Sequence, residues 1–162
     1  MAFFKRLLGL KSVPQEESKA KEFYDDMTID IFARTLWGEA RSEGIEGIEA
    51  VACVILNRVR ISKLFKGYWW GNDIIQVCQK PYQFSCWLKS DPQYQRVISV
   101  NDKDPYFLTC KRVARRAVLG LLSDKTRRAT HYHADYVTPS WAKPSAETKR
   151  IGCHIFYKLI DV

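Results

Sequence analysis

Apolar side chains recur at helical spacing through much of the chain, and this pattern predicts a mainly helical protein. The first helix begins at a candidate N-cap, Asp26 or Thr28, and its apolar stripe consists of Ile29, Phe32, Ala33, Leu36 and Ala40. A second helix is predicted over residues 47–62, where apolar residues cover much of the circumference, as in a helix buried at the centre of a domain.

Three shorter helices are predicted by their start signals. A short helix follows Asp73, and another opens at Asp91-Pro92. A longer one opens at Asp104-Pro105 and continues to Leu121, because proline is well tolerated at the first helical position after a capping aspartate. Residues 65–72 and the stretch from Lys80 predict loops.

The end of the chain has a different pattern. Residues 129–137 alternate and are rich in aromatic and β-branched side chains, which predicts a strand or extended loop. Residues 138–145 contain two prolines and predict irregular structure, and residues 151–159 predict a last strand. The pattern therefore indicates a mainly α fold (α+β) with a small β element late in the chain.

The start of the chain predicts a tail rather than part of the core. Residues 1–24 carry few apolar anchors in their second half, so we expect a tail that is free to be flexible, followed by one folded domain over residues 25–162. The pattern of residues 2–10 is also compatible with a short amphipathic helix that contacts a membrane surface. The sequence predicts neither a secretory signal nor a membrane-spanning helix.

Composition and charge narrow the class of partner. Hydrophobic residues make up 46% and aromatic residues 13% of the 162 residues, which is globular rather than disordered. The net charge of +8 favours an anionic partner, such as nucleic acid, an anionic membrane or a bacterial envelope. The densest basic run, residues 111–128, is equally compatible with a solvated helix face.

Cysteine usage argues against a disulfide framework. The chain has five cysteines, an odd number, and no Cys-x-x-Cys pair. Cys53 and Cys110 lie inside apolar helical patterns, where a thiol usually serves as a small core residue. We therefore expect folding in a reducing compartment.

Glu39 is a candidate general acid. It lies at the end of the first predicted helix, between Gly38 and Ala40 and two residues after Trp37. Apolar surroundings and the negative end of a helix dipole both favour the protonated carboxyl, which a general acid needs near neutral pH. The alternative is a solvated surface charge, because glutamate is a good helix former.

Two other kinds of site are weighed against this one. In an extended chain His131, His133 and Asp135 project to one face, which is compatible with a metal site completed by His154 or Cys153. Against it, no His-Glu-x-x-His motif and no flanking acidic cluster is present, so we expect neither a metal nor a cofactor. A nucleophilic Ser85 or Cys86 has no supporting motif.

Four segments together resemble the spore-cortex-lytic (SleB-like) cell wall hydrolases. Residues 33–59 resemble the opening Ala-Arg-x-x-x-Gly-Glu-Ala-Arg core with its later Asn-Arg-Val, and residues 80–87 resemble a Gln-Phe-Ser-Trp loop with Cys86 inserted. Residues 129–143 resemble an Ala-Thr-x-Tyr/His segment followed by tryptophan. Residues 151–158 resemble a closing Gly-Asn-His-x-Phe-Tyr, with Cys153 in place of asparagine.

The resemblance implies a lysozyme-like, lytic-transglycosylase-type fold that acts on peptidoglycan, with Glu39 as the catalytic acid. No second carboxylate is evident from the spacing of Glu43, Glu46 and Glu49, and Asp73 and Asp135 stay open. This favours a lytic transglycosylase that forms 1,6-anhydro products, with hydrolysis of the same bond as the alternative. The substrate-binding residues it implies are Gln83, Ser85, His131, Tyr132, His133, Trp141 and His154. Trp141 and the Trp69-Trp70 pair are candidates for sugar stacking, with core packing as the alternative.

Partners and location follow as expectations. We expect a monomer that acts on peptidoglycan glycan strands in an anionic envelope, without stable membrane insertion and without nucleic acid. A cell wall enzyme without a secretory signal predicts a phage or prophage endolysin, made in the host cytoplasm and released to the wall by a holin. A basic nucleic-acid-binding module is the alternative from another class, which would show a steep salt dependence of binding.

Overall fold

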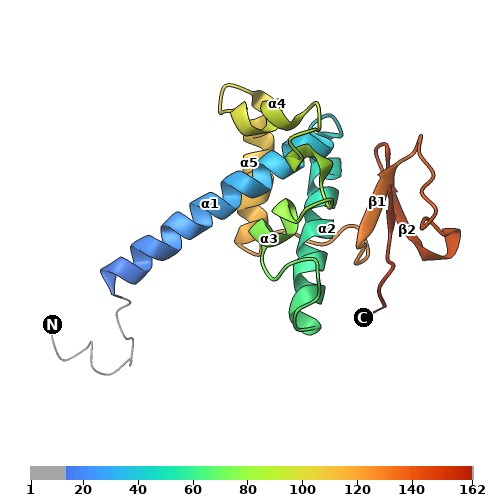
Figure 1. The fold of residues 1–162 in the computed structure, drawn as a ribbon, viewed down its shortest axis with the longest axis horizontal. Coiled ribbons are helices and arrows are strands. Elements are labelled where there is room, and N and C mark those ends of the chain that lie inside the picture. Colours follow the sequence, from blue (N-terminus) through green and yellow to red (C-terminus); the bar gives the residue numbers. More distant parts are fainter. Residues whose placement is uncertain (1–13, 162) are drawn as a thin grey trace.

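Within residues 14–161, which the structure describes, this computed structural model contains five α-helices and a three-stranded sheet (Figure 1). The long helices α1 and α2 pack with α5, and the sheet lies to one side of them. The element bounds are α1 Gln15–Ala40, α2 Gly44–Leu64, α3 Ile74–Gln79, a 3-10 turn at Ser85–Trp87, α4 Tyr94–Ser99, α5 Pro105–Val118, β1 His131–Ala134, a 3-10 turn at Pro144–Ala146, β2 Glu147–Ile151 and β3 His154–Tyr157.

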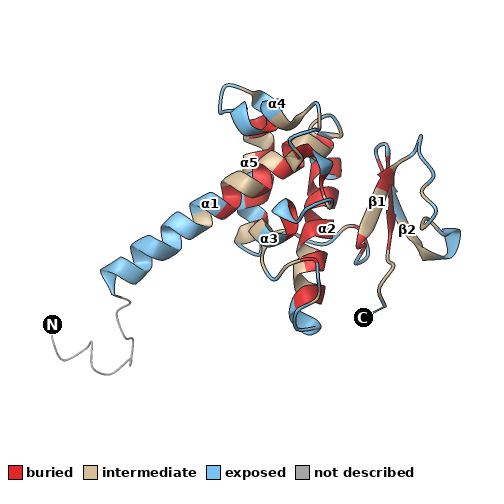
Figure 2. Cartoon of the chain, in the orientation of Figure 1, coloured by how far each residue is buried: buried red, intermediate tan, exposed pale blue. Residues whose placement is uncertain are grey.

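Helix α1 begins earlier than its apolar pattern predicts. It starts at Gln15 instead of Asp26 or Thr28, so residues 15–24, expected in the tail, are helical. This part projects from the domain and is almost wholly exposed (Figure 2). Its glutamates, lysines and alanine are good helix formers, so a helix already formed by the packed half extends through them without a core contact. The membrane-touching helix expected at residues 2–10 lies outside the described residues.

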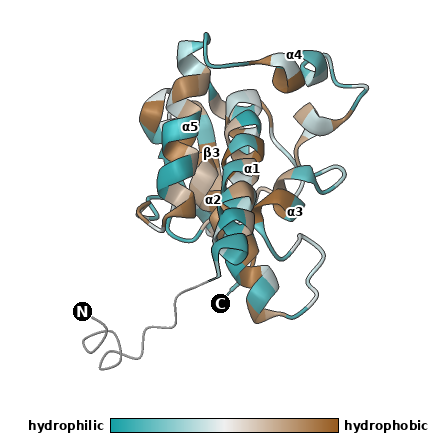
Figure 3. Ribbon diagram, turned by 90° about the vertical axis from the view of Figure 1, so that its left-hand side faces the viewer, coloured by the Kyte–Doolittle hydropathy of each residue, from teal (hydrophilic) through white to brown (hydrophobic). Residues whose placement is uncertain are grey.

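The other predicted helices are confirmed, with shifted ends. Asp73 caps α3 and Asp104 caps α5, each by accepting backbone N–H groups, and Pro105 opens α5. Helix α5 ends at Val118 rather than Leu121, before Gly120 in the left-handed region at φ +70. Helix α5 carries both hydrophobic and hydrophilic residues (Figure 3), and its buried residues recur every three or four positions, so one side of the helix faces the core. Asp91-Pro92 forms a turn, and α4 starts only at Tyr94.

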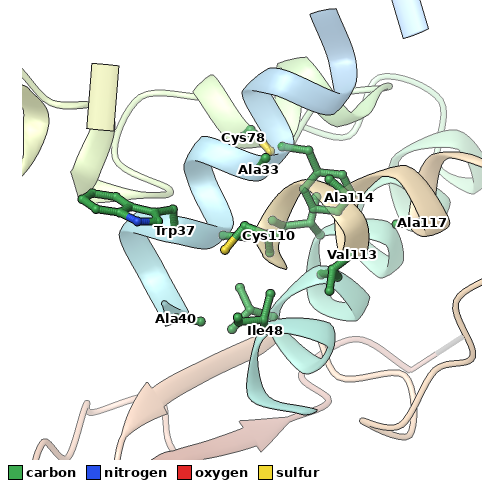
Figure 4. Packing of buried hydrophobic residues seen from close by; sticks show 14 of the residues in the cluster. Ala33, Trp37, Ala40, Ile48, Cys78, Cys110, Val113, Ala114 and Ala117 are labelled. Atoms are coloured by element: carbon green, nitrogen blue, oxygen red, sulfur yellow. The ribbon is translucent and has the colours of Figure 1, made fainter. Parts of the chain in front are cut away.

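The core joins the three long helices. Figure 4 shows Ala33, Trp37 and Ala40 of α1 near Ile48 of α2 and Val113 of α5. These side chains are buried, as are most residues of the middle of α2. The predicted central position of α2 is therefore confirmed. Because α1 is packed from Ile29 to Ala40, its C-terminal end is held rigidly where Glu39 lies.

The sheet is antiparallel, in the order β1-β3-β2. Strand β1 was predicted as an extended segment, but β2 was missed, and residues 151–159 contain a turn before β3 rather than one strand. The turn is at Gly152, with φ +57. Strand β2 reads Glu-Thr-Lys-Arg-Ile, which carries no apolar alternation because it is a largely exposed edge strand.

Candidate active site

A cleft between the end of α1 and the sheet contains Glu39. It has two sections, and both are lined by Gly38, Glu39, Gln93, Ala134, Tyr136 and His154. The junction section, about 230 Å³, adds the α1–α2 junction (Ala40, Arg41, Ser42, Glu43) and Cys153. The loop section, about 360 Å³, adds Arg58, Gln83, Phe84, Ser85, Tyr132, His133 and Val137. Glu39 thus borders both sections of the cleft.

The surroundings of Glu39 shift the pKa of its carboxyl upward. Burial raises the pKa of this carboxyl above its ordinary value. The hydrogen bond from Tyr132, the neighbouring Cys86 thiol and the positive charge of Arg58 oppose that rise, while Asp91 adds to it. The residue remains half-buried, so substrate can reach the acid. A raised pKa favours a carboxyl that donates a proton as a general acid and takes one back once it is ionised.

Gly38 lets the loop with Cys86 approach Glu39. A Cβ at Gly38 would lie 2.9 Å from both Cβ and Sγ of Cys86, closer than real contacts allow. Cys86 is itself buried, and its loop is fixed to α1 by a hydrogen bond of 2.9 Å from Trp87 Nε1 to Thr35 Oγ1. The small residue before the acid therefore allows close approach, as the sequence predicts, and the approaching group is a thiol.

Tyr132 holds the carboxylate of Glu39 from the sheet. Its hydroxyl donates to Glu39 Oε2 at 2.6 Å, and burial raises its own pKa well above the ordinary value. The strand that carries it is positioned by α2: Asn57 Nδ2 donates to the Ala129 carbonyl at 3.0 Å, and Arg58 Nε donates to the Thr130 carbonyl at 2.8 Å. The Asn-Arg pair of the sequence motif therefore fixes the entry of β1.

Arg58 also fixes Gln83 in the loop section. Its Nη1 donates to Gln83 Oε1 at 2.8 Å, and Gln83 Nε2 donates to the Trp70 carbonyl at 3.0 Å. The Arg58 guanidinium lies 5.3 Å from the Trp70 ring and 5.4 Å from the Phe84 ring. A buried cation thus lines the same section of the cleft as the acid, and Gln83 and the exposed Ser85 line it too.

His131 and Trp141 lie outside the cleft. On β1, His131 and His133 flank Tyr132 and project to the other face of the sheet, where Trp141 packs at 5.3 Å and 5.7 Å between ring centroids. His133 Nε2 is 3.0 Å from the Tyr157 hydroxyl, so its ring is held away from Glu39, although the residue borders the loop section. Trp70 is buried in the core and exposed Trp69 does not line the cleft.

His154 is on the cleft side of the sheet. It is opposite Ala134 in the register of β1 and β3, and its ring is 5.0 Å from that of Tyr132. Burial lowers the pKa of its ring, which favours the neutral imidazole. Of the predicted binding residues, the structure therefore places Gln83, Ser85, Tyr132, His133 and His154 along the cleft.

Several cleft residues were missed as site residues. Arg58 belongs to the quoted Asn-Arg motif, and that was the signal that could have found it. Glu43 lines the junction section, although the spacing gave no reason for it to face the cleft. Its Oε2 accepts the Cys153 backbone N–H at 2.8 Å, a contact between residues 110 positions apart. Gln93 and Tyr136 had no sequence signal.

The described residues do not assemble a metal site from the histidine face. Within residues 14–161, no three histidine, cysteine, aspartate or glutamate side chains come close enough to hold a metal ion. In the same range the five cysteines are free thiols, of which Cys153 alone is exposed. No helix of this part of the chain has the length and apolar character needed to cross a membrane.

A helical domain whose buried helix end presents one glutamate to a cleft closed by a small sheet belongs to the lysozyme-like class. The chain belongs to the Cell Wall Hydrolase family, whose model matches residues 42–157. The match begins three positions after Glu39, so the family model does not include that residue.

Curated proteins that are similar in sequence to the chain support this family. The chain is 35% identical over 136 residues to a spore cortex-lytic enzyme of Halalkalibacterium halodurans, covering 82% of this chain and 35% of that protein. It is 32% identical over 138 residues to one from Bacillus cereus, covering 83% of this chain and 46% of that protein. The chain therefore spans less than half the length of these curated relatives.

A solved structure is also similar. The catalytic domain of the germination-specific lytic transglycosylase SleB from Bacillus anthracis aligns with a TM-score of 0.61 and 30% identity, over 81% of this chain and 93% of that one. The SleB catalytic domain of Bacillus cereus aligns with a TM-score of 0.60 at 30% identity, over 82% and 91%.

Proposed function

We propose that this domain cleaves the β-1,4 bond between N-acetylmuramic acid and N-acetylglucosamine in peptidoglycan, with Glu39 as general acid and then base. The observation that carries the proposal is the Glu39 carboxyl, which lines both cleft sections, accepts a hydrogen bond from Tyr132 and has its pKa raised by burial. The similarity to a lytic transglycosylase catalytic domain supports the substrate and the reaction type.

The reaction balances without added water. Glu39 donates its proton to the glycosidic oxygen, and the bond between that oxygen and the muramic acid anomeric carbon breaks, which develops positive charge at that carbon. The 6-hydroxyl oxygen of the same sugar then bonds to the anomeric carbon and gives its proton to the Glu39 carboxylate. The products are a 1,6-anhydro-muramic acid end and a free N-acetylglucosamine hydroxyl, and Glu39 is again protonated.

Hydrolysis of the same bond is a second candidate, and the position of Glu43 favours it. Of the residues that line the two sections, Glu43 is the other acid. An inverting hydrolase needs a carboxylate across the sugar, about 6.5 to 9.5 Å away, to activate water. One oxygen of Glu43 already accepts the Cys153 N–H, which leaves the other oxygen for such a role.

The test is a digest of purified peptidoglycan by wild type and Glu39→Gln, with products identified by mass spectrometry. Anhydro-muropeptides from wild type, about 10²- to 10⁴-fold fewer from Glu39→Gln, and no effect of EDTA support the transglycosylase. Products that carry the mass of one added water change the mechanism to hydrolysis. An equally active Glu39→Gln protein overturns the proposal, and Glu46→Gln, an exposed acid outside the cleft, serves as the matched control.

How the enzyme reaches the cell wall is a separate part of the proposal. The endolysin role and release by a holin are predictions from the sequence, and the net charge of +8 supports attraction to an anionic envelope. Expression in bacteria with and without a co-expressed holin tests this. Rapid lysis only when the holin is present is the expected result, and lysis at the same rate without the holin contradicts it.

A further inference from the structure

The junction section of the cleft has a charge pattern that the loop section lacks. Two opposite charges line it, the Arg41 guanidinium and the Glu43 carboxylate. The loop section instead offers an amide and hydroxyls, from Gln83, Ser85 and Tyr132, beside the buried Arg58. Amides and hydroxyls suit neutral sugars, whereas a fixed cation and anion together suit a ligand that carries both charges.

Arg41 is held in place before any ligand binds. Its Nη1 donates to the Trp37 carbonyl at 3.0 Å and to Gln93 Oε1 at 2.7 Å, and its guanidinium lies 4.2 Å from the centroid of the Trp37 ring. These contacts use one nitrogen and one face of the group. Its Nε and Nη2 make no hydrogen bond to other residues in the described part of the chain, and they are available to a carboxylate.

Glu43 is held equally firmly. Its Oε2 accepts the Cys153 N–H, and a Cβ on Gly152 would lie only 2.5 Å from the same oxygen, so the glycine turn between β2 and β3 closes tightly on the carboxylate. Oε1 has no hydrogen-bond partner among the described residues. Since both side chains are fixed by the fold, a ligand that reaches both pays little ordering cost.

The charged groups of peptidoglycan lie on its stem peptides, because its N-acetylated sugars are neutral. A stem begins on the muramic acid and carries free carboxylates and, at its diamino acid, an ammonium group. Glu39 borders the junction section, so a muramic acid placed against this acid has its stem within reach of Arg41 and Glu43. We propose that the junction section is a subsite for the stem peptide, with Arg41 binding a stem carboxylate and Glu43 the ammonium.

This inference rests on the proposed function and is tested by a comparison of two substrates. Glycan strands with their stems, and the same strands after an amidase has removed them, are digested by wild type, Glu43→Gln and Arg41→Gln. Wild type is expected to cleave stem-bearing strands about tenfold faster. In both variants the ratio of the two rates falls towards one, whereas Glu46→Gln keeps the wild-type ratio.

The variants separate binding from structure. The side-chain amide oxygen introduced by Glu43→Gln can still accept the Cys153 N–H, so the β2–β3 turn stays in place and only the charge is lost. Equal rates on both strands by wild type, or a loss in Glu43→Gln that is the same on both strands, overturns the inference. Binding of the two strands to the Glu39→Gln protein gives an independent readout: a stem preference there supports the subsite even if cleavage fails, and failure of wild type to cleave either strand counts only against the proposed function.

Discussion

The two faces of strand β1 are made of similar residues and do different things. Tyr132 projects towards the helices and donates to Glu39, whereas its neighbours His131 and His133 project to the outer face and pack on Trp141. On the outer face, His133 pairs with the hydroxyl of a second tyrosine, Tyr157. The comparison teaches that the function of a residue in this segment depends on the face of the strand that it occupies. Adjacent positions lie on opposite faces, so a shift by one position changes the function.

We expect the largest difference between the two faces when the two tyrosine hydroxyls are removed one at a time. Tyr132→Phe deletes the donor to Glu39 Oε2, and loss of a hydrogen bond to a charged group, about 1.5–3 kcal/mol, lowers kcat/KM by about 10- to 100-fold. Because this hydrogen bond lowers the pKa of Glu39, its loss raises that pKa, and the alkaline limb of the pH profile moves to higher pH.

Tyr157→Phe is the matched control, since it deletes the same group from the other face. It should cost about 1 kcal/mol of unfolding free energy and leave the pH profile of kcat/KM in place. If both variants lose the same activity, the two faces are not functionally distinct.

The aromatic side chains on the outer face of β1 should contribute to the stability of the fold and not to catalysis. Trp141 packs on His131, His133 and Tyr157, and it is half-buried, so Trp141→Ala should lower the unfolding free energy by about 2 kcal/mol. Denaturant unfolding gives that value, and kinetics on peptidoglycan give KM. A KM raised severalfold in a stably folded variant would restore the sugar-stacking role that the sequence predicts for this tryptophan.

On the cleft face, by contrast, Glu39 should lower the stability of the fold at neutral pH. Burial raises the pKa of Glu39 in the folded state, so this group stabilises the fold below its unfolded pKa and loses that contribution as pH rises through the folded pKa. Glu39→Gln should therefore raise the midpoint of thermal unfolding at neutral pH, by roughly 2–4 °C, with little difference at pH 4. A difference that is constant with pH contradicts this cause.

The smallest effect is expected at the thiol beside the acid. The Cys86 thiol lies close to Glu39 and lowers the pKa of its carboxyl. Cys86→Ala should move the alkaline limb of the kcat/KM profile slightly upward, and Cys86→Ser, with a stronger donor, slightly downward. Shifts in the same direction for both variants would mean that packing on Gly38, rather than the polarity of the side chain at position 86, sets the effect.

The sequence by itself determined the helices that pack and the acid that one of them presents. Apolar periodicity located α2 and the packed half of α1, and the Asp-Pro and Asp signals gave the starts of α5 and α3. Glu39 at a helix end beside small residues was also readable, because helical spacing and close approach are local properties of the chain.

Only the tertiary structure decided what surrounds that acid. A strand pattern with a period of two defines two faces but not which of them meets the helices, so His131 and Trp141 looked as suitable as Tyr132. Glu43 is held at the cleft by its hydrogen bond with the Cys153 N–H. Strand β2 is a strand because it pairs with the edge of β3. Such pairings join residues far apart in the chain, where local propensity carries no information, and their geometry is fixed only when the whole core packs.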